Sequence, residues 1–288
     1  MENIKLVSIV IPCYNDKDYI QESVNSALNQ SYEHIEVIII DDGSDEATKK
    51  VLASINHEKI KLITQENKGL SAARNVGIAN ANGEYILTLD ADDFFENSFL
   101  EKAVHILNSD LEVGVVGCFT NYFEDNYKIV HKNYPSGGNI DDFLFKTNTA
   151  ANSLFRKKCW LDAGGYDENM KKGYEDWEFW ISVTKHNWRV HTIEEFLFNY
   201  RKKEGSMLQT ITNSYIEENH RYILNKHKEL YIRDFDKTIE FLQKATLKYK
   251  ANEIKRLKSI DYKLGHFFLS PLRVLKKCIF ILLNIKNK

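Results

Sequence analysis

Short apolar runs alternate with longer amphipathic stretches over the first hundred residues. The runs are Leu6–Ile11, Ile35–Ile40, Ile60–Thr64 and Tyr85–Leu89. Such runs are typical of strands buried on both faces, and helical apolar spacing follows near residues 18–30, 47–55 and 71–75. Strands that alternate with helices predict a mainly parallel sheet with right-handed crossovers, and Pro12 is expected to end the first strand.

The pattern is less regular from about residue 99 onward. It predicts a strand at 113–119, a hairpin at 122–134, a strand at 152–155, a helix at 157–163, a helix beginning near 174 and two strands at 190–194 and 196–200. Beyond about residue 211 the chain is expected to be helical, since Tyr231, Phe235, Ile239 and Leu242 form one apolar stripe. We therefore expect an α/β domain over residues 1–210 and a basic helical extension over residues 211–288.

Charge is distributed unevenly along the chain. With 43% hydrophobic residues, 28% charged residues and a net charge of −2, the composition is that of an ordinary soluble globular protein. Residues 225–288, however, carry 16 Lys and Arg against 6 Asp and Glu, whereas residues 1–224 carry 23 against 35. This asymmetry indicates that the C-terminal part meets an anionic partner, such as a membrane surface or nucleic acid.

The cysteines and the apolar segments argue against several protein classes. Cys13, Cys118, Cys159 and Cys278 are far apart and include no CxxC pair, so neither a disulfide framework nor a zinc site is indicated. The N-terminal apolar run is too short for a signal peptide, and no run reaches the roughly 18–20 apolar residues that span a bilayer. We expect a cytoplasmic protein.

Acidic residues come immediately after two of the predicted strands. Asp90, Asp92 and Asp93 end the fourth strand, and Asp41 and Asp42 end the second. Ligands of open α/β sheets bind at the carboxyl ends of strands, and carboxylates there suit Mg²⁺ or Mn²⁺ held with substrate phosphates. The alternative is that these residues form only an acidic turn that keeps the strand end exposed to solvent. For Asp93 we favour a solvated helix cap. Neither GxGxxG after the first strand nor GxxxxGK[ST] is present.

Six motifs occur together in a fixed order. They are Ile9-Val10-Ile11-Pro12-Cys13-Tyr14-Asn15, Asp41-Asp42-Gly43-Ser44, Asn67-Lys68-Gly69-Leu70-Ser71-Ala72-Ala73-Arg74-Asn75, Asp90-Ala91-Asp92, Gly164-Gly165-Tyr166-Asp167 and Glu175-Asp176. In this order and spacing, residues 5–206 closely resemble the family 2 glycosyltransferases, which are inverting enzymes. The resemblance implies the GT-A fold: a Rossmann-like α/β domain with a mainly parallel central sheet flanked by helices, here followed by the C-terminal helical extension.

The resemblance implies a nucleotide-sugar donor, typically a UDP-sugar, and a divalent cation, Mn²⁺ or Mg²⁺. Asp92 would ligate the metal together with Asp90, which also holds the sugar–ribose end of the donor. Asp42 would accept a hydrogen bond from the base, against which Tyr14 would lie. The other residues that the resemblance places at the donor are Pro12, Asn15, Lys68, Gly69, Arg74, Ala91 and Glu175. For Arg74 the implied contact is with the base or the phosphates, and the alternative is a surface helix residue.

Asp176 matches the general base of the family. It would take the proton from the acceptor hydroxyl as that oxygen attacks the anomeric carbon. A helix N-terminus favours the ionised carboxylate, so Asp176 is expected to be a weak base, with a pKa near the usual value of roughly 3.9. The alternative is that Asp176 or Glu175 only caps the helix.

One position departs from the family pattern. The family often has Tyr-Arg-x-His-x-x-Ser after the last strand, whereas this chain has Tyr200-Arg201-Lys202-Lys203-Glu204-Gly205-Ser206. Lys203 replaces the histidine, and a protonated lysine cannot ligate a metal. Lys203 could instead meet the diphosphate as a point charge, or it could belong to a solvated basic loop.

The C-terminal residues suggest a partner. Ser270-Pro271 is a good helix start, and the following residues mix apolar with basic side chains, as in a helix that lies on a membrane surface. We expect peripheral contact of residues 265–288 with the inner face of the plasma membrane, beside a glycan or lipid-linked acceptor in polysaccharide biosynthesis. The alternatives are packing on the body or on a second copy as a homodimer. Nucleic acid is disfavoured, because aromatic stacking platforms are not interleaved with the charges.

Two rival functions remain. A sugar nucleotidyltransferase is disfavoured because a glycine- and lysine-rich loop after the first strand is lacking. A catalytically silent nucleotide-sugar-binding module is disfavoured because Asp92 and Asp176 are both in place.

Overall fold

The computed structural model describes residues 4–171, 173–203, 213–260, 262–264 and 269. The chain divides into two units, Met1–His227 and Lys228–Lys288. Helix α9 (Asn213–Lys226) therefore falls within the first unit, beyond the boundary at residue 210 that the sequence suggested.

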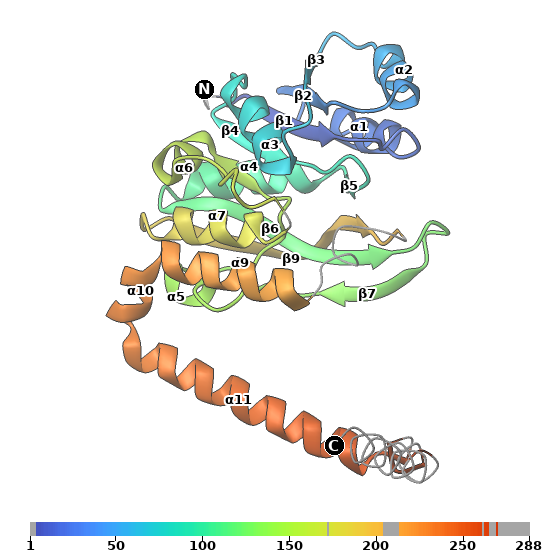
Figure 1. Ribbon diagram of the computed structural model, residues 1–288. Helices are drawn as coiled ribbons and strands as arrows, with labels where there is room; N and C mark the ends of the chain where they lie inside the picture. Colours follow the sequence, from blue (N-terminus) through green and yellow to red (C-terminus); the bar gives the residue numbers. More distant parts are fainter. Residues whose placement is uncertain (1–3, 172, 204–212, 261, 265–268, 270–288) are drawn as a thin grey trace, which may run out of the picture. The chain divides into compact units, whose positions relative to one another are not determined.

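One mixed sheet organises the first unit. Its strands, in the order β3-β2-β1-β4-β8-β6-β9-β5 with β7 paired to β6, form a nine-stranded sheet in the described part of the chain (Figure 1). The strands are β1 Val7–Cys13, β2 Ile35–Asp42, β3 Ile60–Gln65, β4 Tyr85–Thr88, β5 Phe94–Phe95, β6 Val113–Phe123, β7 Ile129–Asn133, β8 Leu154–Arg156 and β9 Arg189–Arg201. Strands β3, β2, β1 and β4 are parallel, as predicted, whereas β8 runs antiparallel to both β4 and β6.

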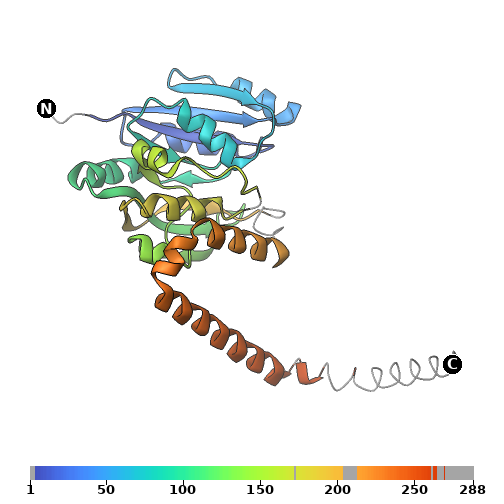
Figure 2. The same cartoon turned by 60° about the vertical axis from the view of Figure 1, so that its left-hand side comes forward.

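Helices cover both faces of this sheet (Figures 1 and 2). In the first unit they are α1 Ile20–Leu28, α2 Glu46–Ser54, α3 Leu70–Ala79, α4 Phe99–Ser109, α5 Ile140–Phe143, α6 Lys157–Ala163, α7 Glu175–Thr184 and α9. On β1, Val7, Ile9 and Ile11 join one core with side chains from α1 and α4. Val10 faces α3, where a Cβ on Gly77 would lie 2.3 Å from a Val10 methyl carbon, so a glycine permits this close approach.

The structure corrects two predicted strand ends. Strand β1 continues through Pro12, which pairs with Ile40 of β2. The neighbouring pairing with β4 ends at Val10, so the missing N–H of Pro12 faces no strand on that side. The two late strands are one strand, β9, whose register with β6 shifts between Ile193 and Phe196. This irregularity explains the interrupted sequence pattern.

The described part of the second unit is helical. It contains α10 (Lys228–Arg233) and α11 (Phe235–Lys258), and the expected apolar stripe is interrupted between them, since Tyr231 belongs to α10 and Phe235 begins α11. None of the side chains of α11 is buried. Among the described residues, we find no helix with the length and apolar character needed to cross a bilayer. Most of the predicted membrane-contacting segment, residues 265–288, lies outside the described residues.

Candidate active site

The acidic turn after β4 is held in place by buried polar contacts. Asp93 is 1% exposed and accepts hydrogen bonds from the backbone N–H of Arg201 (2.8 Å) and from Asn152 Nδ2 (3.3 Å). Burial raises the pKa of Asp93 well above its usual value, and the charges of Asp92 and Asp90 add to this effect. Asp93 is thus a buried anchor of the turn, and the expectation of a solvated helix cap was wrong.

Arg74, from α3, joins the acidic turn to the start of α7. Its Nη2 donates a hydrogen bond to Asp90 Oδ1 and its Nη1 donates one to Glu175 Oε1. Both bonds are 2.8 Å long. The guanidinium is fully buried and lies 5.3 Å from the centre of the Tyr166 ring. The two terminal nitrogens are therefore committed to carboxylates. This placement gives Arg74 a positioning role, and its direct contact with a donor stays a prediction.

Asp176 lies in the first turn of α7, next to Glu175. Burial raises its pKa to about 7, and the charge of Glu175 adds to the shift, while Arg74 and backbone N–H groups oppose it. The helix N-terminus does not keep this pKa low, contrary to the sequence-based expectation, because desolvation outweighs it. Burial raises the pKa of the half-buried Tyr122, and the charges of Asp93 and Asp176 add to the shift, so both carboxylates act on this one side chain.

Helix α7 packs beside α9, as Figures 1 and 2 show. The buried carboxylate of Glu178 lies 2.9 Å from His227 Nε2 and 2.9 Å from Lys226 Nζ. Burial alone would raise the pKa of Glu178, but hydrogen bonds from His227 and Lys226 outweigh it and lower the pKa. Only Trp177 lies between Asp176 and Glu178, so this cluster holds the helical turn that carries Asp176.

Lys203 lies between two carboxylates. Its Nζ is 2.8 Å from Asp92 Oδ2 and also donates to Asp16 Oδ1. Asp16 follows β1 and Asp92 follows β4, and these strands are neighbours. The ammonium therefore occupies the point on which both carboxylates converge.

The residues at this point do not fit a resident divalent cation. Asp90 uses one oxygen for Arg74 and the other for Asn152 Nδ2 (3.3 Å), and Asp92 is paired with Lys203. Within the described ranges, no cluster of three or more His, Cys, Asp or Glu side chains converges as metal ligands would. A metal on Asp92 and Asp90 would compete with Lys203 and Arg74 for carboxylates that these cations already contact.

Asp42 lies at the end of β2, within a network of donors. It is 3% exposed and accepts hydrogen bonds from Gln65 Nε2 (2.7 Å) and from the backbone N–H groups of Lys68 (2.9 Å) and Gly69 (2.9 Å). Each carboxylate oxygen has two lone pairs, so Asp42 retains capacity for a base N–H. Gly69 has a φ of 92°, a conformation that glycine adopts readily and other residues rarely do.

The turn after β1 contacts the turn after β2. The backbone N–H of Asn15 donates to Ser44 Oγ (3.1 Å), and the side chain of Asn15 accepts from the N–H of Asp45 (2.8 Å). Tyr14, beside it, is 51% exposed, so its ring is available to a ligand. Pro12 lies within β1, and Ala91 is buried in the acidic turn.

Three residues of this site were not predicted from the sequence. Asn152 contacts Asp90 and Asp93, and Arg201 donates through Nε to the Asp92 carbonyl oxygen (3.0 Å) and pairs with Glu22. Asp16 shares Lys203 with Asp92. A signal existed only for Arg201, which belongs to the Tyr-Arg motif. Asn152 begins a predicted strand and Asp16 stands in a polar stretch, and no pattern distinguishes either residue from its neighbours.

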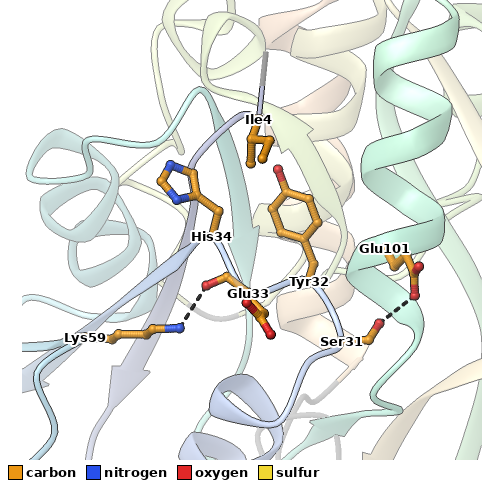
Figure 3. A pocket seen from close by; sticks show the side chains of 7 residues that line it. All are labelled: Ile4, Ser31, Tyr32, Glu33, His34, Lys59 and Glu101. Carbon is orange, nitrogen blue, oxygen red and sulfur yellow. Dashed lines mark hydrogen bonds between the residues drawn. The ribbon is translucent and has the colours of Figure 1, made fainter. Parts of the chain in front are cut away.

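A separate cavity of about 490 Å³ lies on another part of the unit (Figure 3). It is lined by Ile4, Ser31, Tyr32, Glu33, His34, Lys59 and Glu101, in which Lys59 donates to the Glu33 carbonyl oxygen and Ser31 to Glu101. Ile4 precedes β1 and His34 precedes β2, so this cavity is at the amino ends of the strands. The acidic residues are at the carboxyl ends, where the chemistry is expected.

Known proteins resemble this chain over most of its length. An uncharacterised glycosyltransferase of Haemophilus influenzae is 28% identical over 284 residues, which are 92% of this chain and 87% of that protein. The putative teichuronic acid biosynthesis glycosyltransferase TuaG of Bacillus subtilis is 31% identical over 211 residues, 70% of this chain and 81% of TuaG. Some relatives are much longer than this chain. The match to the chondroitin synthase of Escherichia coli covers only 27% of that protein.

Solved structures and a family model agree with these relatives. Residues 1–349 of Staphylococcus aureus TarS in complex with UDP-GlcNAc superpose with a TM-score of 0.60 at 21% identity, over 73% of this chain and 63% of that chain. This likeness shows the GT-A fold. The family model described as glycosyl transferase family 2 matches residues 8–160. By its fold, its relatives and its family match, this chain belongs to the family 2 glycosyltransferases.

Proposed function

We propose that this protein is an inverting glycosyltransferase that moves a sugar from a UDP-sugar to a hydroxyl of a glycan or lipid-linked glycan. TarS was crystallised with UDP-GlcNAc, and TuaG is named for teichuronic acid biosynthesis, which supports this choice of donor and acceptor class. The observation that carries the proposal is the double ion pair of Arg74, which joins the acidic turn to the helix that bears Asp176.

Asp176 serves as the general base in this proposal. The acceptor oxygen forms a bond to the anomeric carbon, its proton passes to the Asp176 carboxylate, and the bond from that carbon to the diphosphate oxygen breaks. A base with a pKa near 7 takes a proton more readily than an ordinary aspartate does. Glu175 does not take this role, because its carboxylate is paired with Arg74.

The remaining residues hold the donor. Asp42 accepts the base N–H while Tyr14 lies against the ring, and the turns containing Pro12, Asn15, Lys68 and Gly69 line this end of the site. Asp90 and Ala91 shape the turn near the ribose. Asp42 is ordered for this task before any ligand binds, since three donors already hold it.

Enzymes of this family commonly use a divalent metal ion. In a metal-dependent form of the proposal, Asp92 and Asp90 would hold Mn²⁺ or Mg²⁺, which would stabilise the charge of the leaving diphosphate. In this form the metal would compete with Lys203 for Asp92, whose Oδ2 lies 2.8 Å from Lys203 Nζ.

Donor binding is the first test of this function. In a thermal-shift panel of nucleotide sugars, we expect UDP-sugars to raise the melting temperature and GDP- and CMP-sugars to leave it unchanged. Slow release of UDP from the same sugar without acceptor would identify a transferase, whereas binding without any release would favour the silent module.

The rate of transfer should rise with pH. Asp176 must be unprotonated to act as base and its pKa is about 7, so kcat/KM is expected to fall tenfold for each pH unit well below 7 and to level off above 8. Initial rates between pH 5.5 and 9 would measure this profile. A rate that is constant from pH 5.5 to 7.5 would remove Asp176 from the role of base.

Residues 265–288 should decide how the protein distributes between the membrane and soluble fractions. We propose that residues 265–288 contact an anionic membrane surface, so deleting them is expected to move the protein from the membrane to the soluble fraction of a cell lysate. Size-exclusion chromatography of the same variant tests the alternative of a homodimer. Unchanged partitioning would contradict the membrane contact.

A further inference from the structure

The carboxylates of Asp92 and Asp16 are already neutralised in part by a side chain. Lys203 Nζ lies 2.8 Å from Asp92 and donates to Asp16, and all three side chains are partly buried, with 20–26% of their surface exposed. A divalent cation in a transferase site has two tasks, to neutralise carboxylates and to attract phosphate oxygens. An ammonium in this position performs part of the first task, since its single charge offsets one of the two carboxylates.

The two ion pairs with Asp92 and Asp16 favour the charged form of Lys203. Burial would lower the pKa of Lys203, but the charges of Asp92 and Asp16 and their hydrogen bonds outweigh burial and raise it. Removing the proton would leave two neighbouring carboxylates without a cation, which is unfavourable in a site shielded from water.

We propose that Lys203 is the cation of the donor site and contacts the diphosphate of the nucleotide-sugar, so that donor binding needs no divalent metal. This inference rests on the proposed function. It concerns only how charge is neutralised at the diphosphate, and a metal-dependent transferase would leave the proposed function standing.

The chemistry of an ammonium suits this task. It has three N–H donors, and the two carboxylates use two of them, so the third can meet a phosphate oxygen. As the bond to the anomeric carbon breaks, negative charge grows on the departing diphosphate. A cation held in advance by Asp92 and Asp16 stabilises this charge without reorganisation.

UDP binding measured by isothermal titration calorimetry tests the inference. In EDTA, the wild-type protein is expected to bind UDP with the affinity that it has in Mn²⁺. Lys203→Met should bind UDP on the order of 10–100-fold more weakly in EDTA, because a buried charge-assisted contact is lost. Mn²⁺ should restore much of the loss in Lys203→Met, since the two carboxylates are then open to the metal.

Two further variants provide controls. Lys202→Met removes the same charge from the neighbouring, exposed position and should leave UDP affinity unchanged. Lys203→Arg keeps a cation and should bind UDP in EDTA far more tightly than Lys203→Met, which separates loss of charge from a failure to fold.

The outcomes distinguish this inference from the proposed function. If wild-type protein binds UDP only with Mn²⁺, Lys203 is a structural ion pair that the metal displaces, and the inference is wrong while the transferase proposal stands. If no variant binds UDP under either condition, both proposals are wrong.

Discussion

Replacing Asp176 with asparagine is expected to lower the rate of sugar transfer at least a hundredfold. Asparagine has nearly the same shape as aspartate but cannot accept the proton of the acceptor hydroxyl, and general base catalysis typically supplies on the order of 10²–10⁴ in rate. Donor binding should change little, because the proposed base acts on the acceptor hydroxyl and not on the donor. Kinetics with varied donor and acceptor would locate the loss in kcat.

Folding of this variant can be checked independently. The folded protein raises the pKa of Asp176 to about 7, which disfavours the ionised form, so the folded state loses stability as the pH rises from about 4 to 7. Asp176→Asn removes this penalty, and its melting temperature at pH 8 should not be lower than that of wild type. Glu112→Gln, which removes an acid from an exposed position, is a control that should retain full activity. Near-normal turnover by Asp176→Asn would exclude this residue as the base.

Replacing Arg74 with methionine should cause the largest loss of stability. The change leaves Asp90 and Glu175 without their shared cation in a largely buried setting, and breaking such a pair costs about 3–5 kcal/mol. We also expect transfer to be strongly reduced in the folded fraction, because Arg74 holds the acidic turn against the start of α7. Urea denaturation and initial rates would measure the two effects.

A second arginine variant tests whether the loss of stability comes from burial of the ion pair or from loss of the charge alone. Arg189→Met breaks an exposed ion pair with Asp110 and should leave the unfolding midpoint nearly unchanged, since solvent screens such pairs. Combining Arg74→Met with Glu175→Gln should recover part of the lost stability, because one of the two unpaired charges is removed. If Arg74→Met and Arg189→Met are equally mild, the central ion pairs do not organise the site.

The sequence by itself determined the strands and their acidic ends. Runs such as Ile35–Ile40 predict buried strands because side chains alternate between two covered faces, and the carboxyl ends of β1, β2 and β4 meet at one edge because these strands are parallel. The positions of Asp42 and of Asp90–Asp93 were therefore predictable. The register shift in β9 and the course of β1 through Pro12 were not, because each depends on which neighbouring strand is present.

Tertiary structure alone decided how the charged side chains pair. Arg74 and Glu175 are 101 residues apart, and no local pattern indicates that one guanidinium joins Glu175 to Asp90. The same holds for Lys203 with Asp92, and for Glu178 of α7 with Lys226 and His227 at the end of α9, which the sequence assigned to a separate extension. Burial then raised the pKa of Asp176, since the helix N-terminus that favours its ionised form is itself shielded from water. Local pattern fixes which residues lie at strand and helix ends, whereas the partners and solvation of those residues follow only from the packing of distant segments.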